Sequence, residues 1–325
     1  MKNLQRRLNF LSVVSLSVVL LLFVAPIFTT SAAYSPRKAT AEAYVVNDES
    51  DTVSVIKGST VVTTISIGSN AEQAAYDPTT HQIFVTNGGS GTVSVIDTSN
   101  NSVVNTISGL SYPTGVVYAP SNHKIYIAEF TGNDIAVVNP KNDQIVTTID
   151  VGSAPQYLVY STANKEVYVS NVGSDTVSAI KTSTNTVVAT ITVGTDPRGI
   201  TFSSANNDVY VTNYDSATVS VINKANTVVT TISGFTDPWD AAYNPSNKDV
   251  YVVDRGTNDV YLVNSKNTIV ATITGMSTPF GVAYYPYHNE MLVTNWGTSA
   301  VSVIVGSKVV GSISVGSDPW GIGVS

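Results

Sequence analysis

The chain has 325 residues, a formal net charge of −7 and only 12% charged residues. It contains no cysteine, which excludes disulfides, thiolate metal sites and cysteine nucleophiles. Its acidic balance disfavours partners with a phosphate backbone, because like charges repel. Ser, Thr, Asn, Val and Gly are abundant, and the apolar spacing of an amphipathic helix does not persist after residue 30. This composition predicts strands joined by polar turns rather than helices.

Residues 1–33 have the order of an export signal. Three basic residues precede the uncharged run 10–28, and the small residues Ser31 and Ala33 stand three places and one place before a cleavage point. The apolar run is also long enough to cross a bilayer. An uncleaved membrane anchor through residues 8–28 is therefore the alternative. In either case we expect the rest of the chain outside the cytoplasm, secreted or at the cell surface.

After a short predicted linker at 34–42, the chain repeats one phrase. The copy that starts at Tyr210 reads YVTNYDSATVSVINKANTVVTTISG. Successive copies, 40 to 42 residues apart, start at Tyr44, Phe84, Tyr126, Tyr168, Tyr210, Tyr251 and Leu292. Seven copies at such regular spacing indicate a repeat architecture over residues 43–325.

Each copy predicts four short strands separated by turns rich in Gly, Asn, Ser and Asp. In the copy of Tyr210 these strands are GITF, YVTN, TVSVI and VVTTI. One four-stranded antiparallel sheet of this size cannot bury both of its faces alone. Sheets stacked radially cover one another, which is the architecture of a β-propeller.

The two ends of the repeat region complete each other. The first copy begins in mid-phrase at AYVVN (43–47), without the strand that follows a proline, and the last copy ends just after such a strand, WGIGV (320–324). We therefore predict an all-β fold, a seven-bladed β-propeller of four-stranded antiparallel blades. Pairing of the C-terminal strand with the N-terminal blade closes the ring.

The phrases YVTN, TVSVI, VVATITVG and DPxG resemble those of the extracytoplasmic YVTN-repeat β-propellers, a family with surface-layer-like members in archaea and bacteria. The resemblance covers residues 43–325 and implies a propeller outside the cytoplasm. The family also includes a proposed single-strand DNA binder. More distantly, seven-bladed propellers include lactonases, streptogramin lyases and quinoprotein enzymes, so the fold alone leaves the function open.

The Asn that closes the YVTN strand recurs in most copies. It stands at Asn47, Asn87, Asn171, Asn213 and Asn295, and Glu129 and Asp254 replace it in the other two copies. A residue kept in nearly every repeat serves the repeat itself. We interpret it as structural, with a side chain that bonds the following turn.

The remaining polar candidates carry weak signals. The three histidines, His81, His123 and His288, all fall in the turn between the first and second strands, away from the loop-rich face where a streptogramin lyase needs its histidine. The run NDESD, with Asp48, Glu49 and Asp51, offers oxygen ligands near Glu72, but it lacks an ordered calcium-loop signature. We predict no catalytic residue, no metal and no cofactor.

The repeat breaks at the position after the proline of the first strand. The residues there are Glu72, Thr114, Gln156, Arg198, Trp239, Phe280 and Trp320. The loops after the YVTN strands lie on the same face and bring Asp48, Phe130, Tyr214, Arg255 and Trp296. From these two sets we predict a binding site at the mouth of the central channel, made by Glu72, Gln156, Arg198, Trp239, Phe280, Trp320, Tyr214, Arg255 and Trp296. The alternative is that the tryptophans pack between blades.

These features predict an exported, non-enzymatic propeller that acts as a cell-surface binding or structural module. Aromatic faces suit sugar rings, so a cell-envelope glycan is the expected partner, with another surface protein as the alternative. An enzyme of lyase or lactonase type that uses the same mouth is the second hypothesis. Nucleic acid ranks last, because the chain is acidic and Arg198 and Arg255 are the basic residues expected at the mouth.

Overall fold

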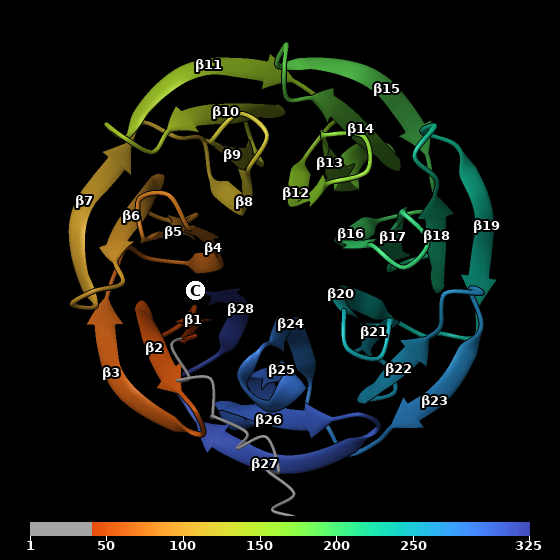
Figure 1. Cartoon of the computed structure of the whole chain (residues 1–325). Helices are drawn as coiled ribbons and strands as arrows, with labels where there is room; N and C mark the ends of the chain where they lie inside the picture. The colour runs from red at the N-terminus through yellow and green to blue at the C-terminus, as the bar shows by residue number, and fades with distance from the viewer. Residues whose placement is uncertain (1–40) are drawn as a thin grey trace, which may run out of the picture. The chain divides into compact units, whose positions relative to one another are not determined.

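In the computed structural model, which describes residues 41–325, every repeat folds into the four-stranded antiparallel sheet that its sequence predicts. Figure 1 shows the seven sheets arranged as blades around one axis, with the first strand of each blade innermost. The predicted export signal and most of the predicted linker lie outside the described residues. Within the described part of the chain, no helix has the length and apolar character needed to cross a membrane.

Four of the seven blades follow one another directly from the N-terminal side. Blade A contains β28 (Pro319–Val324), β1 (Ala43–Asn47), β2 (Thr52–Lys57) and β3 (Thr60–Ser66). Blade B contains β4 (Ala71–Asp77), β5 (Gln82–Asn87), β6 (Thr92–Asp97) and β7 (Ser102–Ser108). Blade C contains β8 (Pro113–Ala119), β9 (Lys124–Glu129), β10 (Asp134–Asn139) and β11 (Gln144–Asp150). Blade D contains β12 (Pro155–Ser161), β13 (Glu166–Asn171), β14 (Thr176–Lys181) and β15 (Thr186–Thr192).

The other three blades complete the ring. Blade E contains β16 (Pro197–Ser203), β17 (Asp208–Asn213), β18 (Thr218–Ile222) and β19 (Val228–Ser233). Blade F contains β20 (Pro238–Asn244), β21 (Asp249–Asp254), β22 (Asp259–Val263) and β23 (Ile269–Ile273). Blade G contains β24 (Pro279–Tyr285), β25 (Glu290–Asn295), β26 (Ala300–Val305) and β27 (Lys308–Ser314). Three short 3-10 turns are η1 (Val172–Ser174), η2 (Tyr287–Asn289) and η3 (Trp296–Thr298).

The predicted closure of the ring is confirmed. β28 pairs antiparallel with β1, with Val45 opposite Ile322 and Ala43 opposite Val324. The backbone N–H of Ser325 also donates a 3.0 Å hydrogen bond to the carbonyl of Glu42. The two ends of the described chain therefore share one blade, and Glu42, placed in the linker by the sequence, already belongs to the propeller.

The core lies between neighbouring blades. In one cluster, Val53 and Val55 of β2 pack with Ile83 and Val85 of β5, so that blade A covers blade B. Equivalent clusters join the other neighbours around the ring. Burial of each such side chain contributes about 1.5–3 kcal/mol. No blade buries its faces alone, so the stability of each blade depends on its two neighbours.

The Asn that closes the second strand is structural, as predicted, but it bonds side chains of the third strand and backbone N–H groups before the first strand, such as that of Gly194, rather than the following turn. Asn213 Nδ2 donates to Thr218 Oγ1 at 3.1 Å and to Ser220 Oγ at 2.9 Å. The same pair of bonds recurs in blades A, B and D. The Asn thus fixes the next strand through the Thr and Ser of the TVS phrase.

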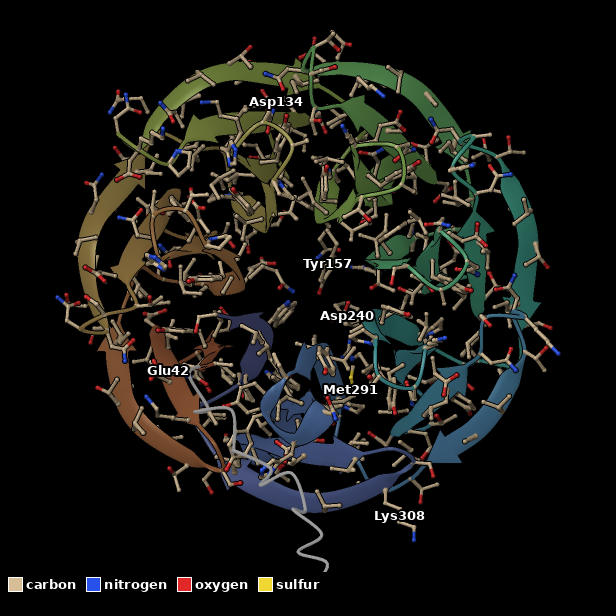
Figure 2. The ribbon with its side chains drawn as sticks, viewed as in Figure 1. Glu42, Asp134, Tyr157, Asp240, Met291 and Lys308 are labelled. Atoms are coloured by element: carbon tan, nitrogen blue, oxygen red, sulfur yellow. The ribbon has the colours of Figure 1, made fainter. Side chains whose placement is uncertain are left out.

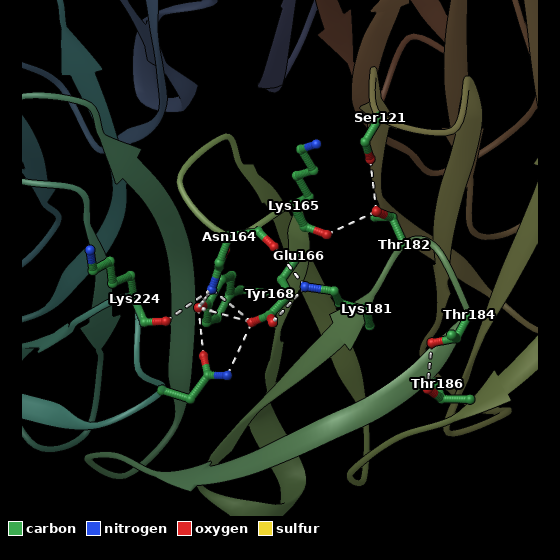
Figure 3. Close-up of polar contacts among 11 residues, drawn as sticks. Ser121, Asn164, Lys165, Glu166, Tyr168, Lys181, Thr182, Thr184, Thr186 and Lys224 are labelled. Atoms are coloured by element: carbon green, nitrogen blue, oxygen red, sulfur yellow. Dashed lines mark hydrogen bonds and ion pairs between the residues drawn. The ribbon is translucent and has the colours of Figure 1, made fainter.

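The Tyr that starts the second strand bonds the next blade at the opposite end of the sheet. Tyr168 Oη donates to Asn226 Oδ1 at 2.5 Å and accepts from Asn164 Nδ2 at 2.7 Å (Figure 3). Corresponding bonds join Tyr44 to Asn101, Tyr126 to Asn185, Tyr210 to Asn267, and Tyr251 to the carbonyl of Gly306. We call these bonds the tyrosine latches. Each one joins a blade to the turn between the third and fourth strands of its neighbour.

Candidate binding site at one end of the propeller axis

The backbone brings the two predicted sets of site residues to one end of the axis. The first residue after the second strand donates its N–H to the carbonyl of the residue just before the first strand. This bond is 3.0 Å from Arg255 to Asp237, 2.9 Å from Tyr214 to Asp196, and 3.0 Å from Trp296 to Thr278. Each loop residue therefore stands beside the innermost strand of its own blade.

Five aromatic rings form one connected cluster at this end. The Trp239 ring lies edge-on to Phe280 at 5.0 Å and to Trp320 at 6.1 Å between ring centroids. Phe280 and Trp320 are 4.4 Å apart. Tyr214 joins the cluster through Trp239 at 5.4 Å, and Trp296 joins it through Phe280 at 5.7 Å. We call Tyr214, Trp239, Phe280, Trp296 and Trp320 the axial aromatic cluster.

The centre of this cluster is packed rather than open. Trp239 is 6% exposed and Phe280 is 3% exposed, whereas Trp296 is 39% exposed. Packing between blades, the alternative that the sequence left open, therefore describes Trp239 and Phe280. Any ligand at this end meets Trp296 and the partly exposed Trp320 and Tyr214 first.

Two arginines lie against the same rings. The Arg198 guanidinium carbon is 4.5 Å from the centre of the Trp239 ring, and that of Arg255 is 4.4 Å from it. Arg255 is also 4.1 Å from the centre of Phe280. Such cation–π contacts stabilise a partly buried cation by about 0.5–2 kcal/mol. The arginines give the aromatic cluster a positive edge.

The polar residues predicted on the other side of the mouth have different roles. Gln156 Oε1 accepts a 3.0 Å hydrogen bond from Arg198, so it belongs to the same group. Thr114 instead bonds the carbonyl of Pro155 in the next blade. Glu72 is buried, and burial raises the pKa of its carboxyl to about 8, with Asp48 adding to the rise and Arg198 opposing it.

Two buried residues on the axis were not predicted, Tyr157 on β12 and Asp240 on β20 (Figure 2). Trp239 and Trp320 lie close enough to Tyr157 for their indole N–H groups to favour its ionised form, although none of the three groups has a well-aligned hydrogen bond within residues 41–325. Burial raises the pKa of Asp240 to about 7, although the N–H groups of Val282 and Ala241 donate to its carboxylate at 3.0 and 2.8 Å.

A sequence signal for Tyr157 and Asp240 exists one place further along the first strand. Four blades have Gly there, because the innermost strands approach closely. A Cβ on Gly199 would meet the Asp240 Cα, and a Cβ on Gly115 would meet the carbonyl oxygen of Gln156. The blades that lack this Gly carry Gln73, Tyr157 and Asp240 instead. A second divergent position therefore marks the side chains on the axis.

The histidines lie away from this end. His81 and His123 stand in turns between the first and second strands, where their Nδ1 atoms are 3.0 and 2.8 Å from Tyr76 Oη and Tyr118 Oη. Within residues 41–325, no group of three or more His, Asp or Glu side chains is arranged to hold a metal ion. A hollow of about 270 Å³ near Asp150 and Thr176 lies between blades C and D instead, among residues that other blades repeat.

Comparisons with known proteins identify the fold. No protein-family model and no curated protein matches the chain. A functionally unknown protein from Desulfotomaculum acetoxidans DSM 771 is 17% identical, with a TM-score of 0.76 over 87% of this chain and 98% of that chain. Kuenenia stuttgartiensis hydrazine synthase is 18% identical, with a TM-score of 0.71 over 81% of this chain and 92% of that chain.

A third similar structure is a lyase. A catalytically inactive histidine-to-alanine variant of virginiamycin B lyase from Staphylococcus aureus, solved with quinupristin, is 14% identical to this chain. Its TM-score is 0.66 over 79% of this chain and 93% of that chain. At these identities the likeness shows the fold and no activity. The chain is thus a seven-bladed β-propeller, and its membership of the YVTN-repeat family stays a prediction.

Proposed function

We propose that this protein is an exported, non-enzymatic β-propeller that binds a cell-envelope glycan at the end of the axis that carries the axial aromatic cluster. The observation that carries the proposal is where the repeat breaks. Five blades keep the Tyr and five keep the Asn of the second strand, yet the residue after the proline differs in almost every blade. The divergent residues gather at one end, where Trp296 offers an exposed ring in the aromatic cluster that two arginines contact through Trp239 and Phe280.

The chemistry of the rim suits a sugar. Aromatic side chains provide large apolar faces at small conformational cost, and a few placed polar groups give orientation. Trp296 has its backbone fixed by the bond to Thr278 and its ring against Phe280, so its exposed face is held in place. Arg255 and Arg198 supply hydrogen-bond donors within the same group of side chains.

A lyase or lactonase that uses the same end is the second candidate, and the fold likeness to virginiamycin B lyase favours it. The inactive variant of that lyase has lost a histidine. Here His81 and His123 bond tyrosines in the turns of the other end, which supports the binding function instead. Turnover of a virginiamycin B-type substrate or a lactone by the purified protein would establish the enzyme.

The test removes the exposed ring and leaves the buried ones. Trp296→Ala should weaken binding to purified envelope polysaccharide about tenfold, the effect of losing roughly 1.4 kcal/mol of stacking. Trp239 is unsuitable, because removing a buried Trp costs about 3–5 kcal/mol of stability. Tyr118→Ala is the control, since Tyr118 is partly exposed and bonds His123 in a turn at the other end. Equal binding by the Trp296 variant and the control contradicts the proposal.

A further inference from the structure

The two arginines of the site differ in their partners. Arg198 Nη2 donates to Asp196 Oδ2 at 2.9 Å, its Nε lies 2.7 Å from Asp196 Oδ1, and its Nη1 donates to Gln156. Arg255 takes part in none of the ion pairs among residues 41–325. Its Nε is buried without a hydrogen-bond partner. The site therefore contains one neutralised arginine and one whose charge is not paired.

The surroundings of Arg255 stabilise its charge only in part. Trp239 and Phe280 face the guanidinium at 4.4 and 4.1 Å, but ring faces leave its N–H groups without acceptors. Burial lowers the pKa of Arg255, as does Arg198, whereas Tyr214, Asp237 and Tyr157 oppose that change. A partly buried cation whose Nε has no acceptor is stabilised further when an anion reaches it.

No acid within the described residues occupies that place. Asp237 is close enough to favour the charge of Arg255, yet the ion pairs among residues 41–325 include neither of them. Glu72 lies nearer to the other side of the mouth, where Asp48 and Arg198 are the charges that act on it. Asp240 accepts from backbone N–H groups on the axis. We therefore expect the hydrogen-bond acceptor for Arg255 to belong to a bound ligand.

Arginine selects the kind of acceptor. Its guanidinium presents parallel N–H groups that match the two oxygens of a carboxylate, and such paired bonds are stronger than bonds between neutral groups. Trp296 contacts the same Phe280 ring as Arg255, and it offers the exposed ring on which the sugar that bears the carboxylate can stack. Both contacts come from loops after the second strands of neighbouring blades, β21 and β25.

We infer that the glycan bound at this end is acidic, and that Arg255 holds a carboxylate of a uronic acid while Trp296 stacks on a sugar ring. This inference rests on the proposed function and adds the charge of the ligand to it. The site thus selects an anionic polymer even though the chain as a whole is acidic, with a formal charge of −7. Local pairing at Arg255 outweighs the distant like charges, which salt screens.

The experiment compares two polymers that differ only in the carboxylate, polygalacturonate and its fully methyl-esterified form. The parent protein should bind polygalacturonate at least about tenfold more tightly, because charge-assisted bidentate bonds are stronger than bonds to the neutral ester. Arg255→Gln should abolish that preference. Arg255→Lys, which keeps the charge but loses the planar fork, should retain part of it.

Lys248→Gln is the matched control, because it removes one positive charge from an exposed turn at the other end of the same blade. Its preference should equal that of the parent. Asp237→Asn should keep the preference or increase it, since Asp237 competes for the same guanidinium. No binding of polygalacturonate by the parent, or equal binding of both polymers, overturns the inference. If envelope polysaccharide still binds through Trp296 and Arg255→Gln changes nothing, the inference fails while the proposed function stands.

Discussion

The two ends of this propeller follow opposite rules. At the end of the tyrosine latches, blade after blade uses the same residue for the same bond, with lengths from 2.5 to 2.7 Å. At the other end, the residue after the proline is different in almost every blade. Both ends belong to the same strands, so secondary structure does not explain the difference. Repetition marks what each blade needs, and divergence marks what the whole ring uses once.

The exceptions at the latch end support this distinction. Blade B has Phe84 and blade G has Leu292 at the latch position, and neither side chain has a hydroxyl group. Between blades G and A, Tyr285 replaces the latch, because its Oη donates to the carbonyl of Ala41 and accepts from the N–H of Gly58, both at 3.0 Å. In blade G the lost latch is thus replaced by another pair of bonds to the next blade. At the aromatic end, by contrast, the divergent residues do not replace one another in a common bond.

The largest expected effect comes from opening the ring. Deleting residues 318–325 removes β28, exposes the edge of β1 and takes Trp320 out of the aromatic cluster. Buried side chains contribute about 1.5–3 kcal/mol each, and whole domains are stable by about 5–15 kcal/mol. We expect the cooperative thermal transition, followed by circular dichroism, to be lost or to fall sharply.

The control for this deletion is a chain that starts at residue 41, which keeps every strand and the ion pair between Glu42 and Lys57. It should melt like the parent. If the C-terminal deletion also melts like the parent, closure by β28 does not hold the ring together. Comparison of the melting temperatures of the two truncated proteins shows whether stability depends on β28 or on the residues before 41.

The sequence predicted the fold almost completely, because each blade repeats the same pattern of strands and turns. The regular spacing of the copies from Tyr44 to Leu292 predicted the seven blades. The C-terminal strand at Trp320, which no further copy follows, predicted how the ring closes. A structural role for the latch tyrosines could also have been predicted, since the Tyr recurs at the start of the second strand. Their partners, such as Asn226, come from a turn of the next blade that no local pattern connects with Tyr168.

The sequence predicted where the site lies, but it did not predict which of its side chains are buried. Divergence after the proline located the end of the axis, and the structure brings Arg198, Trp239, Phe280 and Trp320 together there. Burial of Trp239 depends on how closely seven innermost strands approach, which no single repeat encodes. Tyr157 was missed although the sequence marks it, since four other blades have Gly at the equivalent position and Tyr157 departs from that pattern.

The next largest effect is the pH dependence of stability that the buried carboxyl of Glu72 causes at the aromatic end. The pKa of Glu72 is raised to about 8 by burial, from an ordinary value of 4.5. A folded-state pKa above the unfolded value gives stability that is present below pH 4.5 and is lost as pH rises toward 8. The slope of the free energy of unfolding is at most about 1.4 kcal/mol per pH unit for one such group.

Urea unfolding at a series of pH values should show this decline, and Glu72→Gln should reduce it. Asp240, with a pKa of about 7, should produce the part that remains, between its ordinary value of 3.8 and pH 7. A latch variant such as Tyr168→Phe should leave the slope unchanged. An identical slope in the parent and in Glu72→Gln means that the carboxyl is ionised in the folded protein throughout this range.

The smallest effect measures a single latch. Tyr168→Phe removes the hydroxyl that bonds Asn226 and Asn164, and leaves a partly buried Asn oxygen without its donor (Figure 3). We expect a loss of about 1–3 kcal/mol in the free energy of unfolding. Tyr76→Phe is the control, because the Tyr76 hydroxyl bonds only the exposed side of His81, and its loss should change stability by about 0.5 kcal/mol or less.

A double-mutant cycle decides whether that loss belongs to the contact between blades. Asn226 has φ of 61°, so Asn226→Gly keeps the left-handed backbone while it removes the acceptor. If the bond to Tyr168 joins blade D to blade E, the double variant should be more stable than the two single losses added together predict, by about 0.5 kcal/mol or more. Strict additivity, measured by urea unfolding of all four proteins, means that the tyrosine stabilises only its own blade.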